Sequence, residues 1–584
     1  MRHGQLKRRS FIRATAALTL GGALPLGALS SERPSGSDRN SAARPNVLLI
    51  VTDQEQSWKL LPSTLPLPNR QRLKERGVYF NNAHVNSAIC AVSRGTLYSG
   101  VTGQNNGVWD NTPLPYISGL DSQLPTLGTI MRDQGYTTSY FGKWHLTSTS
   151  AKMGAEGDTL LYQNGAEQPG NAAMAELFRQ YGFDNSDQVG ERDGTWGGAY
   201  FDFQTAKSAG DFIRSNAKSS EPWIAAVNLV NPHDIMFFKT VEHQLRTTYS
   251  QQLSLNGAPD LPGYEKDWQQ PLPRNFGPRT RKALSAHEQL ARSYEYLMGE
   301  IPWDDSQAWL NYRNYYFNCL VDVDKHIGTV LNALEESGQW DNTLVIFTSD
   351  HGEMAGIHGH RGKGGVIYRE ACKVPLCICY PGVKGGVESE AIVSLLDILP
   401  TTIALTASDP AVAAAKYPHL VGKDFSRTLF DSDQAGPRSD SGALIQWTGL
   451  ATADADFTKG FLALATASGA KAKWKAVVNE FQFPRFNLRS QMRGIVTERY
   501  KFARYFSVTE HHVPRDFEEL LRRNDLELYD TLEDPEENKN LAENPQEYKT
   551  IIVELNDKLN ILIGKEVGQD MGQHLPGFEF FWDG

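Results

Sequence analysis

Four apolar runs of this 584-residue sequence each end in side chains that carry charge or bind protons. The runs span residues 46–52, 136–141, 223–230 and 343–348. The side chains that follow them are Asp53 and Gln54, Lys143 and His145, His233, and Asp350 and His351. A single aspartate after a strand commonly opens a turn or caps a helix. Carboxylates, a lysine and imidazoles brought together at one edge instead favour a site that moves protons and stabilises charge.

A cysteine and an arginine form a fifth candidate element. Residues Ser93 to Ser99 can form a short helix that Gly100 closes, which puts Cys90 at or just before the helix start. The free amides and the dipole at a helix start favour negative charge. Arg94, four residues on, can share the face of Cys90. The alternative is that Cys90 is a small buried apolar residue, as free cysteines often are.

The elements that must position these side chains alternate between strands and helices. The four runs resemble buried parallel strands, and helical patterns such as 65–76 and 127–134 lie between them. This alternation predicts an α/β fold with a large, mostly parallel, doubly wound sheet, whose ligands bind beyond the carboxyl ends of the strands. A late helix over 546–563 carries an apolar stripe, which we expect to pack on a C-terminal sheet rather than on a membrane.

The charge balance argues against a general nucleic-acid-binding protein. The chain has 58 Lys+Arg against 68 Asp+Glu, a formal net charge of −10, so it lacks the basic footprint that nucleic acids require. Its 40% hydrophobic content is that of a globular protein. The five cysteines are too few for a disulfide scaffold and lack the spacing of a zinc site.

The first thirty residues have the layout of an export signal. A Lys-Arg-Arg at 7–9 precedes Phe11 and a weakly apolar run over 14–29, shorter than the roughly 20 residues of a membrane-spanning helix. Paired arginines followed by Phe resemble a twin-arginine signal, so we expect a periplasmic or secreted protein with no membrane attachment after cleavage. Residues 31–44 are polar and are interpreted as a linker. Removal of the five basic residues in 1–30 changes the formal charge from −10 to −15.

The segment around Cys90 and the strand ends together carry a family resemblance. Cys90-Ala-Val-Ser93-Arg94 is followed by Leu97-Tyr98-Ser99-Gly100. The chain also has, in this order, the four strand ends described above, Gly-Lys-Gly at 362–364, and the segments 394–401, 494–501 and 527–541. This set resembles the type I sulfatases, whose signature core is Cys-x-Pro-Ser-Arg, over Pro45 to about Gly564. The resemblance implies an alkaline-phosphatase-like fold. It would have a catalytic domain at 45–435 and a smaller C-terminal domain, with an antiparallel sheet and a helix, at 436–584.

The same resemblance implies a sulfuric ester hydrolase whose nucleophile derives from Cys90. In the family a maturation enzyme oxidises this cysteine to formylglycine before export. One hydroxyl of the hydrated aldehyde attacks sulfur, the alcohol leaves, and the second hydroxyl expels sulfate. A divalent metal polarises the sulfate, and its implied ligands are Asp53, Gln54, Asp350 and His351, beside Cys90. The other implied roles are Arg94 holding the modified side chain, Lys143 and Lys363 neutralising sulfate oxygens, His145 assisting the hydrated aldehyde, and His233 protonating the leaving alcohol.

Two features depart from the family pattern. Val92 stands where the signature has Pro, and the maturation enzymes favour Pro or Ala there. If Cys90 stays a thiol, the alternative is a non-catalytic anion-binding descendant. The pairs Asp53-Gln54 and Asp350-His351 are similar to those of choline sulfatases and phosphonate monoester hydrolases. They leave a phosphonate or phosphate mono- or diester hydrolase as the second enzymatic alternative. Calcium is the expected ion on family frequency, and the imidazole makes manganese the alternative.

Substrate choice is expected to reside outside these motifs. The regions 151–200 and 235–310, rich in Gly, Asn, Gln and aromatic residues, are long excursions of the kind that usually carry specificity. Their aromatic residues could stack on a sugar or aryl group, or fill a small core of their own. Because the overall charge is acidic, we expect a small or lightly sulfated substrate. The expected protein partners are the maturation enzyme and the twin-arginine export machinery.

Overall fold

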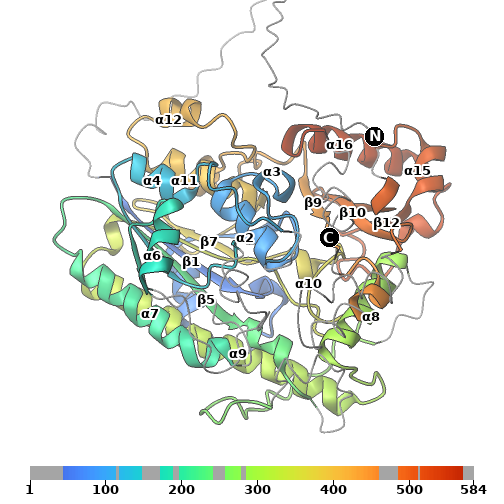
Figure 1. Cartoon of the computed structure of the whole chain (residues 1–584), viewed down its shortest axis with the longest axis horizontal. Helices are drawn as coiled ribbons and strands as arrows, with labels where there is room; N and C mark the ends of the chain where they lie inside the picture. Colours follow the sequence, from blue (N-terminus) through green and yellow to red (C-terminus); the bar gives the residue numbers. More distant parts are fainter. Residues whose placement is uncertain are drawn as a thin grey trace, which may run out of the picture. The chain divides into compact units, whose positions relative to one another are not determined.

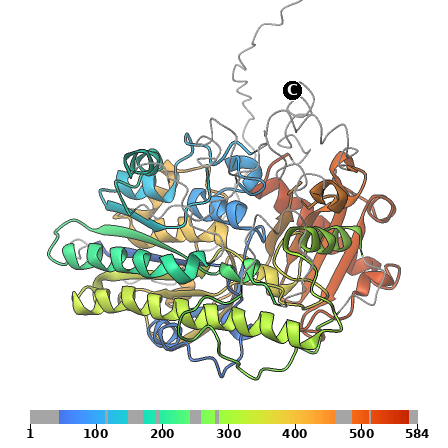
Figure 2. The same cartoon turned by 60° about the horizontal axis from the view of Figure 1, so that its bottom comes forward.

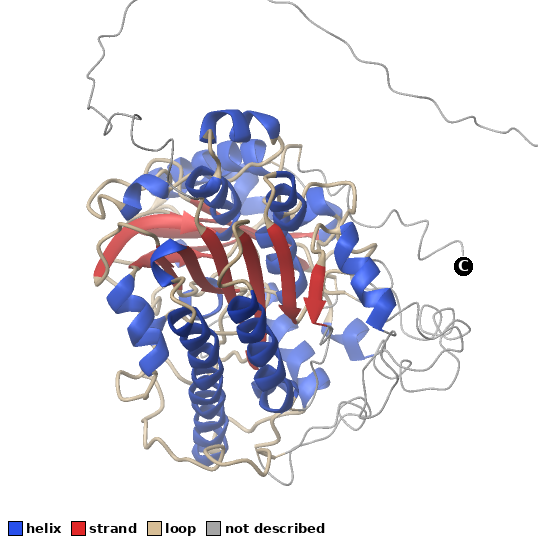
Figure 3. Ribbon diagram, turned by 90° about the vertical axis from the view of Figure 1, so that its left-hand side faces the viewer, coloured by secondary structure: helices blue, strands red, loops and turns tan. Residues whose placement is uncertain are grey.

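Eight strands form a large sheet that lies between two layers of helices (Figure 1 and Figure 3). In this computed structural model the strand order is β4-β3-β5-β1-β6-β7-β2-β8. Neighbours are parallel except that β7 pairs antiparallel with both β6 and β2. The strands are β1 (Asn46–Asp53), β2 (Val78–His84), β3 (Thr137–Gly142), β4 (Asn185–Asp187), β5 (Trp223–Pro232), β6 (Thr343–Ser349), β7 (Leu376–Cys379) and β8 (Val387–Ser394).

The structure describes residues 44–569 with internal gaps. The gaps are 113–116, 148–170, 188–195, 241–256, 278–283, 451, 460–484 and 511–512. The predicted signal at 1–30 and nearly all of the predicted linker at 31–44 lie outside the described residues, as do parts of both predicted specificity regions. None of the helices among the described residues is long and apolar enough to cross a membrane.

One face of the large sheet is covered by two long helices, α7 (Gly197–Ser215) and α9 (Ser306–Glu336), which lie side by side (Figure 2), together with α1 (Pro68–Arg76). Successive side chains of a strand point to opposite faces. Leu48 and Ile50 of β1 therefore pack against this layer.

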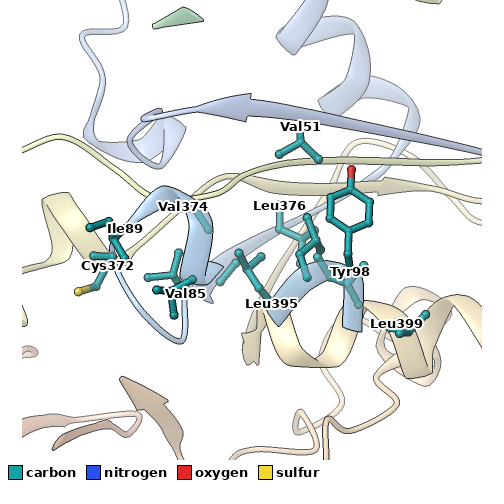
Figure 4. Close-up of a cluster of buried hydrophobic side chains, with 14 of the residues drawn as sticks. Val51, Val85, Ile89, Tyr98, Cys372, Val374, Leu376, Leu395 and Leu399 are labelled. Atoms are coloured by element: carbon teal, nitrogen blue, oxygen red, sulfur yellow. The ribbon is translucent and has the colours of Figure 1, made fainter. Parts of the chain in front are cut away.

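The opposite face is covered by α2 (Cys90–Ser99), α4 (Leu127–Asp133) and α11 (Ile398–Thr406). Figure 4 shows side chains from this layer, including Ile89 and Tyr98, among residues of the sheet such as Val51 and Leu376. Every residue of α2 is buried, so the helix that begins at Cys90 is held rigidly against the carboxyl ends of the strands.

A second, antiparallel sheet has the order β12-β11-β10-β9. Its strands are β9 (Ala443–Trp447), β10 (Arg489–Val496), β11 (Tyr500–Ser507) and β12 (Asp525–Asp530). The C-terminal helix α16 (Lys549–Glu566) packs on it through Ile552, Leu555 and Leu559. The predicted apolar stripe is confirmed, while the helix begins and ends three residues later than the predicted 546–563. The predicted boundary between residues 435 and 436 remains a prediction.

Short elements connect these layers. Within the described part of the chain, the remaining helices are α3 (Gly103–Asn106), α6 (Asn171–Gln180), α8 (Ser285–Met298), α10 (Arg369–Cys372), α12 (Pro410–Lys416) and α15 (Phe517–Arg523). The 3₁₀ segments are η1 (Trp58–Leu60), η2 (His233–Phe237), η3 (Trp340–Asn342), η4 (Leu395–Asp397), η5 (Ser426–Leu429), η6 (Val508–Glu510) and η7 (Leu541–Glu543).

The predicted α/β class with a mostly parallel sheet and a smaller antiparallel part is confirmed. All four predicted strands form, each extended by one or two residues at its carboxyl end. The first predicted helix begins at Pro68 rather than at residue 65, because proline is suited to the first helical position but not to the interior. The helix at Cys90 begins three residues earlier than Ser93 and ends at Gly100 in the left-handed conformation, as predicted.

Candidate active site

The carboxyl ends of β1, β3, β5 and β6 bring the predicted polar side chains to one edge of the large sheet. Close packing fixes this edge: a Cβ on Gly142, at the end of β3, would lie 2.0 Å from the carbonyl oxygen of Asn228 in β5. Gly142 also has a φ of +87°, which side chains disfavour. The chain can therefore turn sharply from β3 into Lys143 and His145.

Cys90 is the first residue of α2 and lies at the centre of the predicted set. Its Sγ lies 2.8 Å from Nζ of Lys363, 3.1 Å from Nε2 of His351 and 3.6 Å from Oδ1 of Asp53. Cys90 is buried, as the apolar interpretation expected, but its sulfur is surrounded by charged and polar atoms. These charged and polar neighbours favour a role for Cys90 in the chemistry of the site over a role as an apolar core residue.

The donor atoms around Cys90 suit a cation. Nδ1 of His351 lies 2.9 Å from the carbonyl oxygen of Gly352, so the proton of the neutral ring is on Nδ1 and the lone pair is on Nε2. That lone pair faces Oδ1 of Asp53 at 3.4 Å and Oδ1 of Asp350 at 3.5 Å. Acceptors facing one another in a buried site are stabilised by a bound metal ion. The ligand atoms of Asp53, Cys90, Asp350 and His351 all lie within 4.8 Å of one another.

Gln54 also lies at this site, in the left-handed conformation with a φ of 73°. Its backbone N–H donates to Oδ1 of Asp350 (3.1 Å), and its Oε1 accepts from Nζ of Lys363 (2.8 Å). The amide oxygen, rather than the amide nitrogen, thus points toward the metal-binding residues. This orientation fits the predicted role of Gln54 as an additional ligand.

Three buried cations surround the carboxylates and the thiol. Nζ of Lys143 lies 2.8 Å from Oδ2 of Asp53, and Nη1 of Arg94 lies 3.5 Å from Oδ2 of Asp350. Arg94 also donates from Nε to the carbonyl oxygen of Trp144 (3.1 Å), which fixes its direction. Lys363 lies beside Cys90, so the two carboxylates and the thiol each have a basic side chain next to them.

These charges change the pKa values of the site. Burial alone would raise the pKa of Asp53, but Lys143, His233, Lys363 and His351 outweigh it and hold the pKa well below its usual range. Burial, reinforced by the charge of Asp53, raises the pKa of Asp350. Burial and the charge of Lys363 lower the pKa of His351, which keeps its ring neutral.

The cations keep their charge in this setting. Burial would lower the pKa of Lys363, but Cys90 and Asp53 outweigh it and raise that pKa. Burial also opposes the charge of Arg94, whose pKa is nevertheless raised by Tyr140 and Asp350. Lys363 and Arg94, two of the side chains that would meet a sulfate group, therefore remain positive.

The two predicted catalytic histidines flank the site. Nε2 of His145 lies 2.6 Å from the carbonyl oxygen of Thr112, so Nε2 carries the proton and Nδ1 is the acceptor of the neutral ring. His233 begins η2 immediately after the cis peptide bond between Asn231 and Pro232. Pro232, the residue before it, is the register partner of Asp53, so His233 lies next to the carboxyl end of β1.

Sequence reasoning missed two residues that hold the site. Glu353 accepts hydrogen bonds from Nε2 of Gln54 (2.5 Å) and from the N–H of Gly362 (2.8 Å). Asn228 accepts from Nη2 of Arg94 (2.6 Å) in the middle of β5. A polar residue inside the apolar run 223–230 was a usable signal for Asn228. Glu353, two residues after His351, gave no comparable signal.

Aromatic residues of the predicted specificity regions are mostly part of the core where the structure describes them. Tyr264 is buried and its OH donates to Oδ2 of Asp322 (2.9 Å). Tyr294 is buried and its OH accepts from the N–H of Lys363 (3.0 Å). For these two residues the structure supports an internal packing role over sugar stacking.

Comparison with known proteins identifies the family. The sequence pattern of the sulfatase family matches residues 45–408, more than half of the chain. The chain belongs to the sulfatase family. It is 29% identical over 415 residues to YidJ, an uncharacterized sulfatase of Escherichia coli (strain K12), covering 67% of this chain and 75% of that protein.

Solved structures share the fold of this sulfatase. A 2-O GAG sulfatase matches with a TM-score of 0.60 at 20% identity, covering 90% of this chain and 93% of the other. A phosphonate monoester hydrolase from Silicibacter pomeroyi matches with a TM-score of 0.59 at 17% identity, covering 91% and 96%. The family resemblance expected from the motifs is thus confirmed, and the protein is a sulfuric ester hydrolase with the alkaline-phosphatase-like fold.

Proposed function

We propose that this sulfatase hydrolyses its sulfate ester through a nucleophile derived from Cys90 by conversion to formylglycine. The observation that carries the proposal is the position of Cys90 Sγ, 2.8 Å from Nζ of Lys363 and 3.1 Å from Nε2 of His351, at the start of a buried helix. The converted side chain supplies a hydroxyl nucleophile when hydrated. The helix start and its surrounding cations hold that side chain in one place.

The proposed cofactor is one divalent metal held by Asp53, Gln54, Asp350 and His351 beside residue 90. Calcium is proposed first, and manganese is the alternative because the set includes an imidazole. When bound, the metal polarises the sulfate group. Elemental analysis of the purified protein identifies the ion.

The proposed role of Lys143, Lys363 and Arg94 is to stabilise negative charge. A sulfate ester carries its charge on three oxygens, and more charge develops on the leaving oxygen during hydrolysis. Buried, fixed cations stabilise such charge more strongly than water does, because they need no reorganisation. Lys143 and Lys363 have fixed positions through Asp53 and through Cys90 with Gln54, respectively.

Proton transfers are assigned to the two histidines. His145, whose Nε2 donates to Thr112, has its lone pair on Nδ1 and is proposed to accept a proton there. His233 is proposed to protonate the leaving alcohol oxygen. Its place at the end of β5 puts it at the same sheet edge as the cations.

The protein is proposed to act outside the cytoplasm. The twin-arginine pattern at residues 7–13 supports delivery to the periplasm or the medium after maturation in the cytoplasm. The proposed substrate is small or lightly sulfated, because an acidic surface disfavours the approach of a polyanion. A strong preference for a heavily sulfated polymer over its small sulfated fragments would contradict this part of the proposal.

Two alternatives have an observation in their favour. The pairs Asp53-Gln54 and Asp350-His351, together with the shared fold of the phosphonate monoester hydrolase, favour hydrolysis of a phosphonate or phosphate ester at the same site. Val92, in place of the signature proline, favours an unconverted Cys90 and hence an anion-binding descendant without turnover.

The test combines mass spectrometry with one substitution. Protein isolated from its own host is digested, and the peptide that contains residue 90 is expected to carry the mass of the aldehyde. Cys90→Ala is expected to lower kcat/KM for an aryl sulfate by several orders of magnitude, since loss of a nucleophile can cost about 10⁶-fold. Cys319→Ala, at a buried cysteine of α9, is the matched control and keeps activity. A quantitative thiol at residue 90 in an inactive wild-type protein supports the anion-binding alternative.

A further inference from the structure

Four donor atoms from three distant segments, one of them the sulfur of Cys90, meet at one place in the fold. Cys90 comes from α2, Asp53 from the end of β1, and Asp350 with His351 from the residues after β6. Because the ligands are so far apart in the chain, the spacing of cysteines gave no indication of a thiolate metal site. In space, the ligand atoms all lie within 4.8 Å of one another and all four residues are buried.

Four of the six separations between these atoms lie close to those around a small tetrahedral ion. Sγ of Cys90 lies 3.1 Å from Nε2 of His351 and 3.6 Å from Oδ1 of Asp53, and Nε2 lies 3.4 Å and 3.5 Å from the two aspartate oxygens. Zinc bonds of about 2.0–2.3 Å to S, N and O ligands give tetrahedral edges of roughly 3.3–3.6 Å. Calcium prefers six to eight oxygen ligands, a set to which a thiolate and an imidazole contribute none.

Cations already lie beside the donor atoms of this site. The Nζ of Lys363 lies 2.8 Å from Sγ of Cys90. Asp53 and Asp350 have their own cations in Lys143 and Arg94. When an ion binds, the thiol proton passes to water and the sulfur–metal bond forms, with no change of oxidation state.

We propose that chains in which Cys90 remains a thiol bind Zn²⁺ through Cys90, Asp53, Asp350 and His351. The proposal rests on the metal-ligand assignment of the proposed function, but it concerns a different chemical form of the chain. Formylglycine has no sulfur, so conversion removes the soft ligand and leaves the oxygen-rich set that suits calcium. Val92 differs from the residue that maturation enzymes favour, which favours a population of chains that keep the thiol.

The test uses full-length protein made without a maturation enzyme, with the thiol at residue 90 verified by mass spectrometry. Cobalt replaces zinc as a spectroscopic probe, because a sulfur–cobalt bond gives a charge-transfer band in the near ultraviolet. We expect this band to saturate at one cobalt per chain and to be displaced by zinc. Cys90→Ser is expected to lose the band, while Cys319→Ala retains it.

Zinc affinity provides the second measurement. Competition with a chromophoric chelator is expected to show that Cys90→Ser weakens zinc binding by more than the ~10–100-fold that loss of an outer-shell partner costs. Calcium binding is expected to change little in the same variant. X-ray absorption at the zinc edge of the unsubstituted protein, which requires no variant to fold, is expected to show one sulfur and several lighter ligands.

Three results would overturn the proposal: no charge-transfer band, a band that survives Cys90→Ser, or a zinc environment without sulfur. Sulfatase activity of the converted, calcium-loaded enzyme is measured in parallel. Activity without zinc binding by the thiol form removes this inference and leaves the proposed function intact. Zinc binding by the thiol form, with no sulfatase activity after conversion, supports this inference and contradicts the proposed function.

Discussion

At the scale of single residues, the site concentrates positive charge within an acidic protein. Lys143, Lys363 and Arg94 lie beside the two carboxylates of Asp53 and Asp350, so the basic side chains outnumber the acidic ones at this buried site. The whole chain has a formal charge of −10. Attraction of a sulfate monoester must therefore come from this local cluster rather than from the long-range field.

Val92→Pro is expected to increase the fraction of chains with an aldehyde at residue 90. The family's maturation enzymes favour proline at this position, and the fold accepts it. The first i to i−4 bond of α2 runs from the N–H of Ser93 to the carbonyl oxygen of Ile89, so a proline at 92 removes no helical hydrogen bond. Quantitative mass spectrometry of the Cys90 peptide from cells that contain the maturation enzyme is the measurement.

Val92→Leu is the control, since it keeps an apolar residue without the proline. It is expected to convert no better than the wild type. If the proline variant folds normally and its aldehyde fraction equals that of the wild type, residue 92 does not limit conversion.

At the scale of elements, one carboxylate links the metal-binding edge to the loop that carries Lys363. Glu353 accepts from Nε2 of Gln54 (2.5 Å), the OH of Tyr312 in α9 (3.2 Å), and the N–H groups of Ala355 and Gly362 (both 2.8 Å). Because Nε2 of Gln54 is held by Glu353, its Oε1 must face Lys363. The orientation of the two site residues thus depends on a side chain that has no predicted catalytic role.

Glu353→Gln is expected to lower kcat/KM by about 10–100-fold, the usual cost of losing an outer-shell partner of a metal site. The new amide group must present a donor where the carboxylate accepted, so Gln54 loses its fixed direction. The metal concentration for half-maximal activity is expected to rise as well. Steady-state kinetics across a metal titration measure both effects.

Glu335→Gln, on the exposed part of α9, is the matched control for charge removal. It is expected to leave both quantities unchanged. A Glu353→Gln protein with wild-type kinetics and metal dependence would falsify the orienting role of this carboxylate.

At the scale of the whole molecule, a buried ion network joins the catalytic sheet layer to the C-terminal helix. Arg438 donates from Nε and Nη2 to the two oxygens of Asp397 (2.5 and 2.6 Å) and from Nη1 to Glu566 of α16 (2.6 Å). Asp397 also accepts from the N–H groups of Ser394 and Lys423. A segment that resembles the family, 394–401, is thus held in place by the last helix.

Arg438→Met is expected to lower the free energy of unfolding by about 3–5 kcal/mol, because it leaves two buried carboxylates without their cation. Thermal and urea unfolding measure the change. Arg489→Met, which breaks a partly exposed pair with Asp525 on the second sheet, is the control and is expected to cost only about 0–1 kcal/mol. Equal losses in the two variants would contradict this account of the network.

Acid sensitivity is expected from His84, at the end of β2. Burial, reinforced by Lys373, Lys501 and Arg438, lowers the pKa of His84 well below the ordinary value of 6.5. The unfolded chain binds a proton near pH 6.5 while the folded chain does not. The free energy of unfolding therefore falls as the pH drops below about 6.5, by up to ~1.4 kcal/mol per pH unit from this group.

Urea unfolding at pH 7.5 and 5.5 measures this effect. His84→Leu is expected to show a smaller loss of stability between the two pH values than the wild type. The same loss in both proteins would assign the acid sensitivity to other groups.

Sequence patterns predicted what is local and missed what depends on distant partners. The strand ends, the helix at Cys90 and the stripe of α16 follow from short-range patterns, and all are present. The antiparallel insertion of β7 was not predicted, because the partner of a short apolar strand is chosen by the whole sheet. Glu353 was missed for the same reason: its partner Gln54 lies 299 positions away in the chain.

Sulfate ester hydrolysis at the Cys90 site is tested by a parallel measurement of kcat/KM for an aryl sulfate and for a phosphonate monoester. It uses metal-loaded wild-type protein of known aldehyde content. We expect faster turnover of the sulfate ester, at a rate proportional to the fraction of chains with an aldehyde at residue 90. Negligible sulfate release with fast cleavage of the phosphonate would contradict this expectation.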